Sequence, residues 1–431
     1  MSARTDGSSR FGANNRYGFF PAASVGWVVT EESFLKDQKI LSFLKPRIST
    51  GVTGNQSFAD FASLGLFAGN SGYVGIPGQR PSQLANPNLK WESTRQTDAG
   101  IEFALLDNRI SGEVDVYQKL TTDLALNVPL PATTGFINQF QNVGNLENKG
   151  VEMALTTRNF VGAFTWTTTV NAARNYNKVT NLKGLPIAGA GLNRAQEGFP
   201  IGTFFGPEFA GVDPGNGNAL YYLNKRASDP TGAATIDHST GTTSNINLAQ
   251  AVPLGDPNAK WTGGFTNTFT FKGVDLTATV IGVSGNSIFD NAGQFYSVGF
   301  NNGPDNQTRD QLRRWQKPGD NTDIPKAIFF GGNGTGNSSR FVYDGSYVRL
   351  RTLTLGYNLP AELAKKGYLQ SARIYVQGLN LLTFTKYPGF DPEVNTDYLS
   401  NTITQGNINQ GIDFYSTPQP RTLTFGLNLG F

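Results

Sequence analysis

The residues that could carry out catalysis are scarce in this sequence. The chain of 431 residues has no cysteine and a single histidine, His238, which lies in a segment rich in glycine, serine and threonine. Catalysis by histidine requires a positioned partner group, so we interpret His238 as a solvated loop residue. The absence of cysteine excludes disulfide bonds and thiolate metal sites.

Two glycine-rich segments look superficially like ligand-binding loops. Residues 332–337, GNGTGN, are followed by neither a Lys-Ser/Thr pair nor a helical pattern, so they are not expected to bind phosphate. Residues 211–218, GVDPGNGN, lack the oxygen-ligand spacing of a calcium loop and are predicted to form a turn. We therefore expect no catalytic residue, no metal site and no cofactor, and predict that the protein is not an enzyme.

Aromatic residues in long polar segments are better candidates for chemistry. Aromatic rings stack on CH-rich faces of ligands, and neighbouring Asn and Asp side chains accept hydrogen bonds. The candidates for substrate contact are Phe295, Tyr296, Trp315, Tyr387, Phe390, Asp391, Tyr398 and Tyr415. Packing of loops on one another, or on a lid, is the alternative for each of them. Residues 387–392 also fit a rigid turn, because two prolines fix the backbone there.

The elements that position these residues are predicted to be strands. The last eleven residues, RTLTFGLNLGF, alternate between polar or small and apolar residues up to the final Phe431. Such a period of two indicates a β-strand with one apolar face. Alternation of this kind predicts about eleven strands: residues 17–30, 44–54, 98–105, 110–116, 151–156, 164–170, 261–271, 274–280, 347–358, 372–384 and 421–431. The phase slips near Arg351 and Thr352, which predicts a β-bulge.

The connections between these strands alternate in length. Short connections are predicted at residues 31–43, 106–108, 159–163, 272–273 and 359–371. Long ones, rich in Gly, Asn, Pro and Ser, are predicted at residues 55–90, 126–139, 178–260, 286–345 and 386–419. Tight turns at one end and long loops at the other are typical of outer-membrane barrels. The fold class is therefore predicted as all-β, a transmembrane antiparallel β-barrel.

An odd number of strands cannot close an antiparallel barrel, and an open sheet edge is not tolerated in lipid. We therefore expect strands that precede residue 17 to be missing. Residues 1–431 are interpreted as one domain, the C-terminal part of a larger barrel.

Six sequence blocks carry a resemblance to a known family. In chain order they are RYGFFPAASVGW (16–27), GVTGNQ (51–56), NPNLKWE (86–92), NVGNLENKGVE (142–152), DGSYVRLRTLTLGYNLP (344–360) and GLNLLTFTKYPGFDPEVN (378–395). Together they resemble the C-terminal half of the SusC/RagA-type TonB-dependent receptors over nearly the whole chain. No block is specific alone, but the combination is.

The resemblance implies about eleven strands of a 22-stranded barrel in the outer membrane of a Gram-negative bacterium, surrounded by lipid. It implies import of glycan or peptide fragments with a SusD-type lipoprotein as partner, and it implies no nucleic acid. The plug, the TonB-binding segment and a signal peptide are not found in the sequence, so the TonB complex would act only through a missing N-terminal region. Residues 221–239 lack a calcium-loop spacing, so no metal is carried over. Phe431 is similar to the terminal aromatic read by the barrel-insertion machinery, or is an interface anchor.

Charged residues on the polar strand faces would point into the lumen of such a barrel. Ion pairs that line a plugged lumen are the first interpretation and a substrate path is the second. The candidates facing the lumen or plug are Arg349, Arg351, Lys45, Arg47, Glu102 and Glu113. Two other functions stay open at this point: a soluble or cell-surface structural or adhesive β-protein, and a passive porin. A soluble fold would bury the apolar faces, whereas a membrane barrel would expose them.

Overall fold

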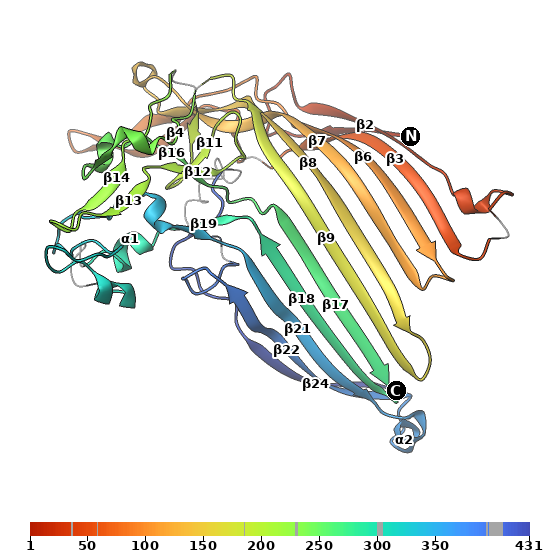
Figure 1. The fold of residues 1–431 in the computed structure, drawn as a ribbon. Coiled ribbons are helices and arrows are strands. Elements are labelled where there is room, and N and C mark those ends of the chain that lie inside the picture. The colour runs from red at the N-terminus through yellow and green to blue at the C-terminus, as the bar shows by residue number, and fades with distance from the viewer. Residues whose placement is uncertain are drawn as a thin grey trace.

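A computed structural model describes residues 1–35, 38–57, 59–184, 186–228, 232–299, 305–393, 395 and 408–431. Twelve antiparallel strands form one large sheet (Figure 1). In spatial order they are β1 (Ser2–Gly7), β2 (Tyr17–Gly26), β3 (Leu41–Asn55), β6 (Glu92–Leu105), β7 (Ile110–Pro129), β8 (Asn138–Phe160), β9 (Phe164–Asn181), β17 (Trp261–Phe271), β18 (Val274–Ser284), β21 (Tyr347–Asn358), β22 (Ser371–Thr385) and β24 (Thr422–Gly430). All eleven predicted strands are confirmed. The twelfth, β1, was missed because its sequence SARTDG has no apolar alternation.

The strands β7 and β8 are much longer than predicted, so the long loop expected at residues 126–139 is wrong. Only residues 130–137 connect them. The pairing shifts register between Thr121 and Leu124, where Asp123 adopts a φ of 60°. This irregularity breaks the period of two, yet pairing resumes and continues to Pro129. The extension carries both strands past the ends of their neighbours, toward the long loops (Figure 1).

The connections at the two ends of the sheet differ in length, as the sequence predicts. Lys272 and Gly273 have φ values of 47° and 85°, the left-handed geometry of a two-residue hairpin turn. A short helix, α2 (Ala361–Lys366), forms the connection between β21 and β22 at the same end. The long connections gather at the opposite end of the sheet (Figure 1).

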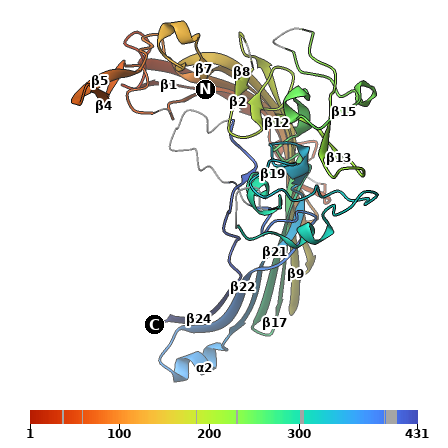
Figure 2. The same cartoon turned by 90° about the vertical axis from the view of Figure 1, so that its left-hand side faces the viewer.

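The sheet curves into an arc and exposes its apolar outer face. Figure 2 shows the arc with β1 and β2 toward one extremity and β24 at the other. Large apolar side chains remain exposed along the outer face, including Val25, Ile48, Ile101 and Phe425, the last at 80%. A water-soluble sheet would cover such a face with a second layer, whereas lipid covers it in a membrane barrel.

The other face of the sheet is polar. Threonine pairs cross neighbouring strands, with 3.1 Å between the hydroxyl oxygens of Thr266 and Thr279 and 3.3 Å between those of Thr268 and Thr277. Among the described strands, β24 pairs only with β22 and ends the sheet. Among the helices of the described residues, none is long and apolar enough to cross a membrane.

The long loops fold into small sheets of their own. These are β10 (Ile187–Ala188), β11 (Asn193–Ala195), β12 (Thr203–Gly206) and β16 (Val252–Gly255); β13 (Phe209–Val212), β14 (Ala219–Tyr222) and β15 (Thr242–Thr243); β20 (Val342–Asp344), β19 (Ser287–Asp290) and β23 (Ile412–Asp413); and the hairpin β4 (Leu66–Tyr73) with β5 (Ile76–Gln83). The helix α1 (Gly293–Tyr296) follows β19. Short 3-10 helices occupy Val29–Glu31, Ala132–Thr134, His238–Thr240, Ile246–Leu248, Arg309–Arg313 and Ser339–Phe341. Buried apolar clusters lie beneath these loops and fix their positions, one around Phe204, Phe289 and Ile412.

Candidate functional site

Two long loops that are far apart in sequence are joined by a small sheet. Strand β19, from the loop after β18, pairs in parallel with β23, from the loop before β24. The register places Phe289 beside Ile412 and Asp290 beside Asp413. Phe289 and Ile412 are fully buried, so apolar packing stabilises the pairing of β19 with β23, which forms the joint between the two loops. The residues after each strand are thereby brought side by side.

This joint assembles three of the predicted substrate contacts into one aromatic cluster. The ring centroids of Tyr296 and Tyr415 lie 6.0 Å apart, and those of Phe295 and Phe414 lie 5.9 Å apart. Phe414, which the sequence analysis did not single out, also contacts Tyr415 at 5.0 Å. All three contacts have edge-to-face geometry, which aromatic pairs favour.

Tyr415 is the exposed member of the cluster. Its side chain is 57% exposed, and its backbone adopts a φ of 54°. A left-handed conformation costs a residue with a Cβ atom roughly 1–2 kcal/mol, so the surrounding structure must hold it in place. The cluster therefore presents one aromatic ring to solvent on an anchored base. That is the arrangement expected of a ring that stacks on a ligand.

Two buried carboxylates lie beneath the aromatic rings. The Tyr296 hydroxyl donates a hydrogen bond to Asp290, and the Tyr387 hydroxyl donates one to Asp413 at 2.6 Å. Tyr343 packs edge-to-face on Tyr387, with 6.1 Å between the centroids. Tyr387 is only 4% exposed, and its ring and hydroxyl hold the joint together; its contact with substrate stays a prediction.

Burial is the main cause of the shifted pKa values of Asp290 and of the tyrosines around it. The pKa of Asp290 is raised to about 6: burial is the main cause, the hydrogen bond from Tyr296 opposes the shift, and the nearby Asp413 carboxylate adds to it. Burial likewise raises the pKa of Tyr343 to about 12, and it raises the pKa values of Tyr296 and Tyr387 well above the ordinary value. All three tyrosines are therefore neutral at physiological pH, Tyr296 and Tyr387 act as hydrogen-bond donors, and Asp290 takes up a proton under mildly acidic conditions.

The remaining aromatic candidates lie elsewhere in the loops. Phe390 is 82% exposed and free to contact a ligand. Trp315 is half-buried: its Nε1 donates to the carbonyl of Pro214 at 3.0 Å, and the Lys326 ammonium lies 5.9 Å from its ring centroid. Trp315 thus holds two loop segments together. Tyr398 lies outside the described residues.

Arg349 and Arg351 bind a loop of this chain. The Arg349 guanidinium pairs with Asp391 and, at 2.9 Å, with Glu393, while Arg351 pairs with Glu393. Arg349 is 1% exposed and Asp391 is 4% exposed. These ion pairs engage both arginines and Asp391 within the chain, whereas contact of the arginines with a plug and of Asp391 with substrate stay predictions. Their charges are used to attach the loop that follows β22 to the polar face of β21.

A bulge in β21 turns Arg351 toward this loop. On β18 the register places Val280 beside Leu350 and Thr279 beside Thr352, so Arg351 has no partner of its own in the ladder. The predicted bulge is confirmed. The Arg351 guanidinium also donates to Asn380 Oδ1 at 3.0 Å, which bridges the irregular pairing with β22. Bulges of this kind re-aim a side chain, and here the bulged residue reaches Glu393.

The other predicted lumen residues form one ion-pair network on β3, β6 and β7. Arg47 lies at its centre and contacts Asp98 at 2.9 Å, Asp115 at 2.7 Å, Glu102 at 3.1 Å and Glu113 at 3.6 Å. Lys45 pairs with Glu102 at 3.2 Å. The sequence put Lys45, Arg47, Glu102 and Glu113 on polar faces, and the strand register brings them together.

Glycine makes room for this network. Gly100 lies between Arg47 and Asp115 in the strand register. A Cβ atom at Gly100 would lie 1.9 Å from the Asp115 carboxylate oxygen, so a larger residue would block the pair. The network holds four carboxylates and two cations, which leaves the inner wall locally acidic.

His238 is better anchored than the sequence indicates. Its ring stacks on Tyr222 at 3.8 Å between centroids, and its Nε2 lies 3.0 Å from Glu208 Oε2. The partner was not detectable because it lies thirty residues earlier in the chain. Within the described residues, no group of three or more His, Cys, Asp or Glu side chains is placed to hold a metal ion.

The fold and the site define the wall of an outer-membrane-type β-barrel with elaborated loops, and comparison with known proteins identifies its family. A family model described as TonB dependent receptor-like, beta-barrel matches residues 1–279. The chain belongs to this family of TonB-dependent receptors.

Individual relatives extend the similarity to the whole chain. The chain is 38% identical to TonB-dependent receptor P3 of Formosa agariphila over 449 residues, which cover 100% of the chain and 44% of that receptor. It is 31% identical to TonB-dependent receptor SusC of Bacteroides thetaiotaomicron, covering 100% of the chain and 42% of SusC. The solved structure of the RagAB peptide transporter superimposes with a TM-score of 0.84 at 28% identity, covering 100% of the chain and 45% of the matched chain. The chain thus spans less than half the length of these relatives and is of the SusC/RagA type.

Proposed function

We propose that this chain forms part of a TonB-dependent transporter in the outer membrane of a Gram-negative bacterium, which imports oligosaccharides or peptides together with a SusD-type lipoprotein. The observation that carries the proposal is the apolar outer face of the sheet from β2 to β24, combined with long loops gathered at one end. Such a sheet is stable with lipid on its outer face and polar contents on its inner face.

The loops supply a surface on which a substrate can bind. Tyr415 and Phe390 expose aromatic rings, and the buried joint beneath Tyr415 fixes its position. Aromatic rings on a rigid base stack on sugar rings and on peptide side chains alike, which fits both substrate classes. In this proposal the protein is a carrier and not an enzyme.

Uptake in intact cells tests the proposal. A strain that lacks the gene should lose uptake of a fluorescently labelled oligosaccharide or peptide mixture, and the intact gene should restore it. Loss of the TonB protein should abolish uptake equally, because a transporter of this family draws its energy from TonB. Uptake that continues without TonB would support a passive porin instead.

Partnership with a lipoprotein is tested by purification. The full receptor should be recovered from the outer membrane in a stable complex with a lipoprotein. Recovery of the receptor alone under mild detergent conditions, with undiminished uptake in a strain that lacks the neighbouring lipoprotein, would contradict that part of the proposal.

A further inference from the structure

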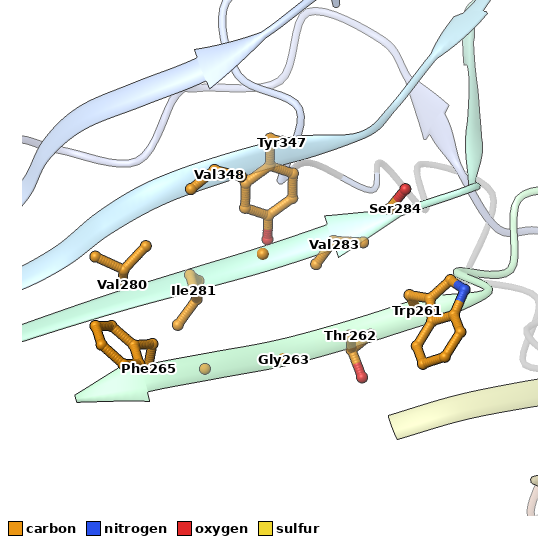
Figure 3. Close-up of a pocket in the computed structure, with 12 residues that line it drawn as sticks. Trp261, Thr262, Gly263, Phe265, Val280, Ile281, Val283, Ser284, Tyr347 and Val348 are labelled. Carbon is orange, nitrogen blue, oxygen red and sulfur yellow. The ribbon is translucent and has the colours of Figure 1, made fainter. Parts of the chain in front are cut away.

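An apolar hollow lies on the outer face of the sheet near the long-loop end. It has a volume of about 380 Å³ and is lined by β17, β18 and β21 (Figure 3). On β17, Trp261 and Phe265 stand at its two ends with Gly263 between them. Val280 and Val348 line it from the neighbouring strands. Trp261, Phe265 and Val348 are exposed residues of the outer face.

The hollow exists because two glycines meet in the strand register. Gly263 lies beside Gly282 on one side and beside Ala172 on the other. A Cβ atom at Gly282 would meet nothing closer than 3.7 Å, so the fold does not require glycine there. Larger side chains at these positions would fill the space above the sheet. Because the residues here are small, a depression about as wide as three strands remains.

A cation stands at the rim of the hollow. Arg174 is the register partner of Trp261, and its guanidinium carbon lies 5.1 Å from the Trp261 ring and 4.6 Å from the Tyr176 ring. None of the ion pairs among the described residues involves Arg174, and its Nε has no hydrogen-bond partner. By contrast, Arg47, Arg349 and Arg373 on the same sheet all pair with carboxylates.

The neighbourhood of Arg174 is basic. By the period of two, Lys178 shares its face on β9, and Lys149 lies beside Tyr176 on β8. One acid, Glu147, lies beside Lys178, and it accepts a hydrogen bond from Gln118 and lies 4.0 Å from Lys149. Three cations and one anion therefore share this face of β8 and β9, on the side of the hollow where Arg174 pairs with Trp261. Trp261 and Tyr176 are the amphipathic aromatic residues that mark the level of lipid headgroups.

We propose that the hollow and Arg174 together form a binding site for a lipid of the surrounding membrane whose phosphate headgroup carries a net negative charge. One acyl chain occupies the hollow, and the phosphate lies against the Arg174 guanidinium. A planar guanidinium offers several N–H donors that match phosphate geometry, and the two flanking rings hold it at the surface. Apolar area alone would not favour one lipid over another, so selectivity comes from the charge.

Native mass spectrometry of the full receptor in mild detergent tests this site. The probes are dipalmitoylphosphatidic acid, dipalmitoylphosphatidylcholine and a neutral dipalmitoyl lipopeptide. Arg174→Gln removes the charge, and Gly282→Leu fills the hollow from a position where an added Cβ atom meets nothing closer than 3.7 Å. The matched controls are Lys272→Gln, which removes a cation beside an aromatic ring at the other end of β17, and Ala278→Leu, which enlarges an outer-face residue of β18 that does not line the hollow.

The wild-type receptor should retain phosphatidic acid in preference to the other probes. Arg174→Gln should weaken that retention by about tenfold, as loss of a charge-assisted contact implies, and Gly282→Leu should weaken it further, whereas both controls should behave as wild type. Equal retention of all three probes, with no effect of Arg174→Gln, would overturn the proposal and would point to a lipoprotein acyl anchor or to ordinary membrane lipid. If Gly282→Leu fails to fold, as judged by its gel mobility before and after heating, the probe preference and Arg174→Gln decide the outcome.

Discussion

Replacing Arg349 by Met should release the loop that follows β22. The substitution preserves most of the side-chain volume but leaves the buried Asp391 carboxylate without its cation. Removing one partner of a buried ion pair costs about 3–5 kcal/mol. Asp391 still accepts backbone N–H bonds from Glu393 at 2.8 Å and Gln419 at 2.9 Å, so we expect the lower end of that range.

Hydrogen exchange measures this effect directly. A loss of about 3 kcal/mol raises the open population of the loop base by roughly a hundredfold, which should appear as faster exchange at residues 386–393 and 415–421. Arg373→Met is the matched control, because Arg373 pairs with Asp275 at the other end of β22. The double variant Arg349→Met with Asp391→Asn should recover much of the protection. Unchanged exchange in Arg349→Met, or no recovery in the double variant, would refute the role assigned to this pair.

Three further predictions concern the other charged and aromatic groups. The pKa of Asp290 is raised from 3.8 to about 6, so between these pH values the folded joint keeps a proton on Asp290 that the unfolded chain loses. The stability of the joint should therefore fall by about 3 kcal/mol as the pH rises from about 4 to about 6. Asp290→Asn should abolish this pH dependence, measured by hydrogen exchange of residues 287–296. Arg47→Gln leaves Asp98 and Asp115 unpaired and should lower barrel stability by about 1–3 kcal/mol, seen as unfolding at lower temperature on unheated gels; an unchanged transition would contradict the network. Tyr415→Ala should weaken substrate binding by about tenfold without changing the fold, whereas Phe329→Ala, at an exposed ring in another loop, should not; equal effects would exclude Tyr415 as a contact.

The strands of the sheet were predictable because lipid imposes a simple rule on them. Each membrane strand must alternate, so the sequence reveals both the strand and its outer face, as in residues 421–431. The rule fails where alternation is absent or interrupted. The strand β1 has no apolar alternation, and the pairing of β7 with β8 is interrupted at Asp123, so one strand was missed and two were predicted too short.

The site was less predictable because its contacts join distant segments. The charge of Arg349 and the alternation around it predicted a polar strand face. No neighbouring residue in the sequence indicates that its partners are Asp391 and Glu393. The parallel pairing of β19 with β23 creates the Tyr296–Tyr415 contact, and strands of four and two residues leave no periodic signal. Solvent exposure also decides which aromatic residues are accessible to a ligand. Only the fold shows that Tyr415 is exposed and Tyr387 is buried.

The most direct test of the membrane-wall assignment is a cysteine scan along β17, because the chain contains no cysteine of its own. Single cysteines at Phe265 and Phe269 on the outer face, and at Thr266 and Thr268 on the inner face, are labelled in the full receptor in membranes with an environment-sensitive fluorophore. Membrane burial predicts alternation: labels at Phe265 and Phe269 are quenched by lipid-borne nitroxides, and labels at Thr266 and Thr268 are not. Absence of alternation, or shielding of the outer face from lipid-borne quencher, would contradict it.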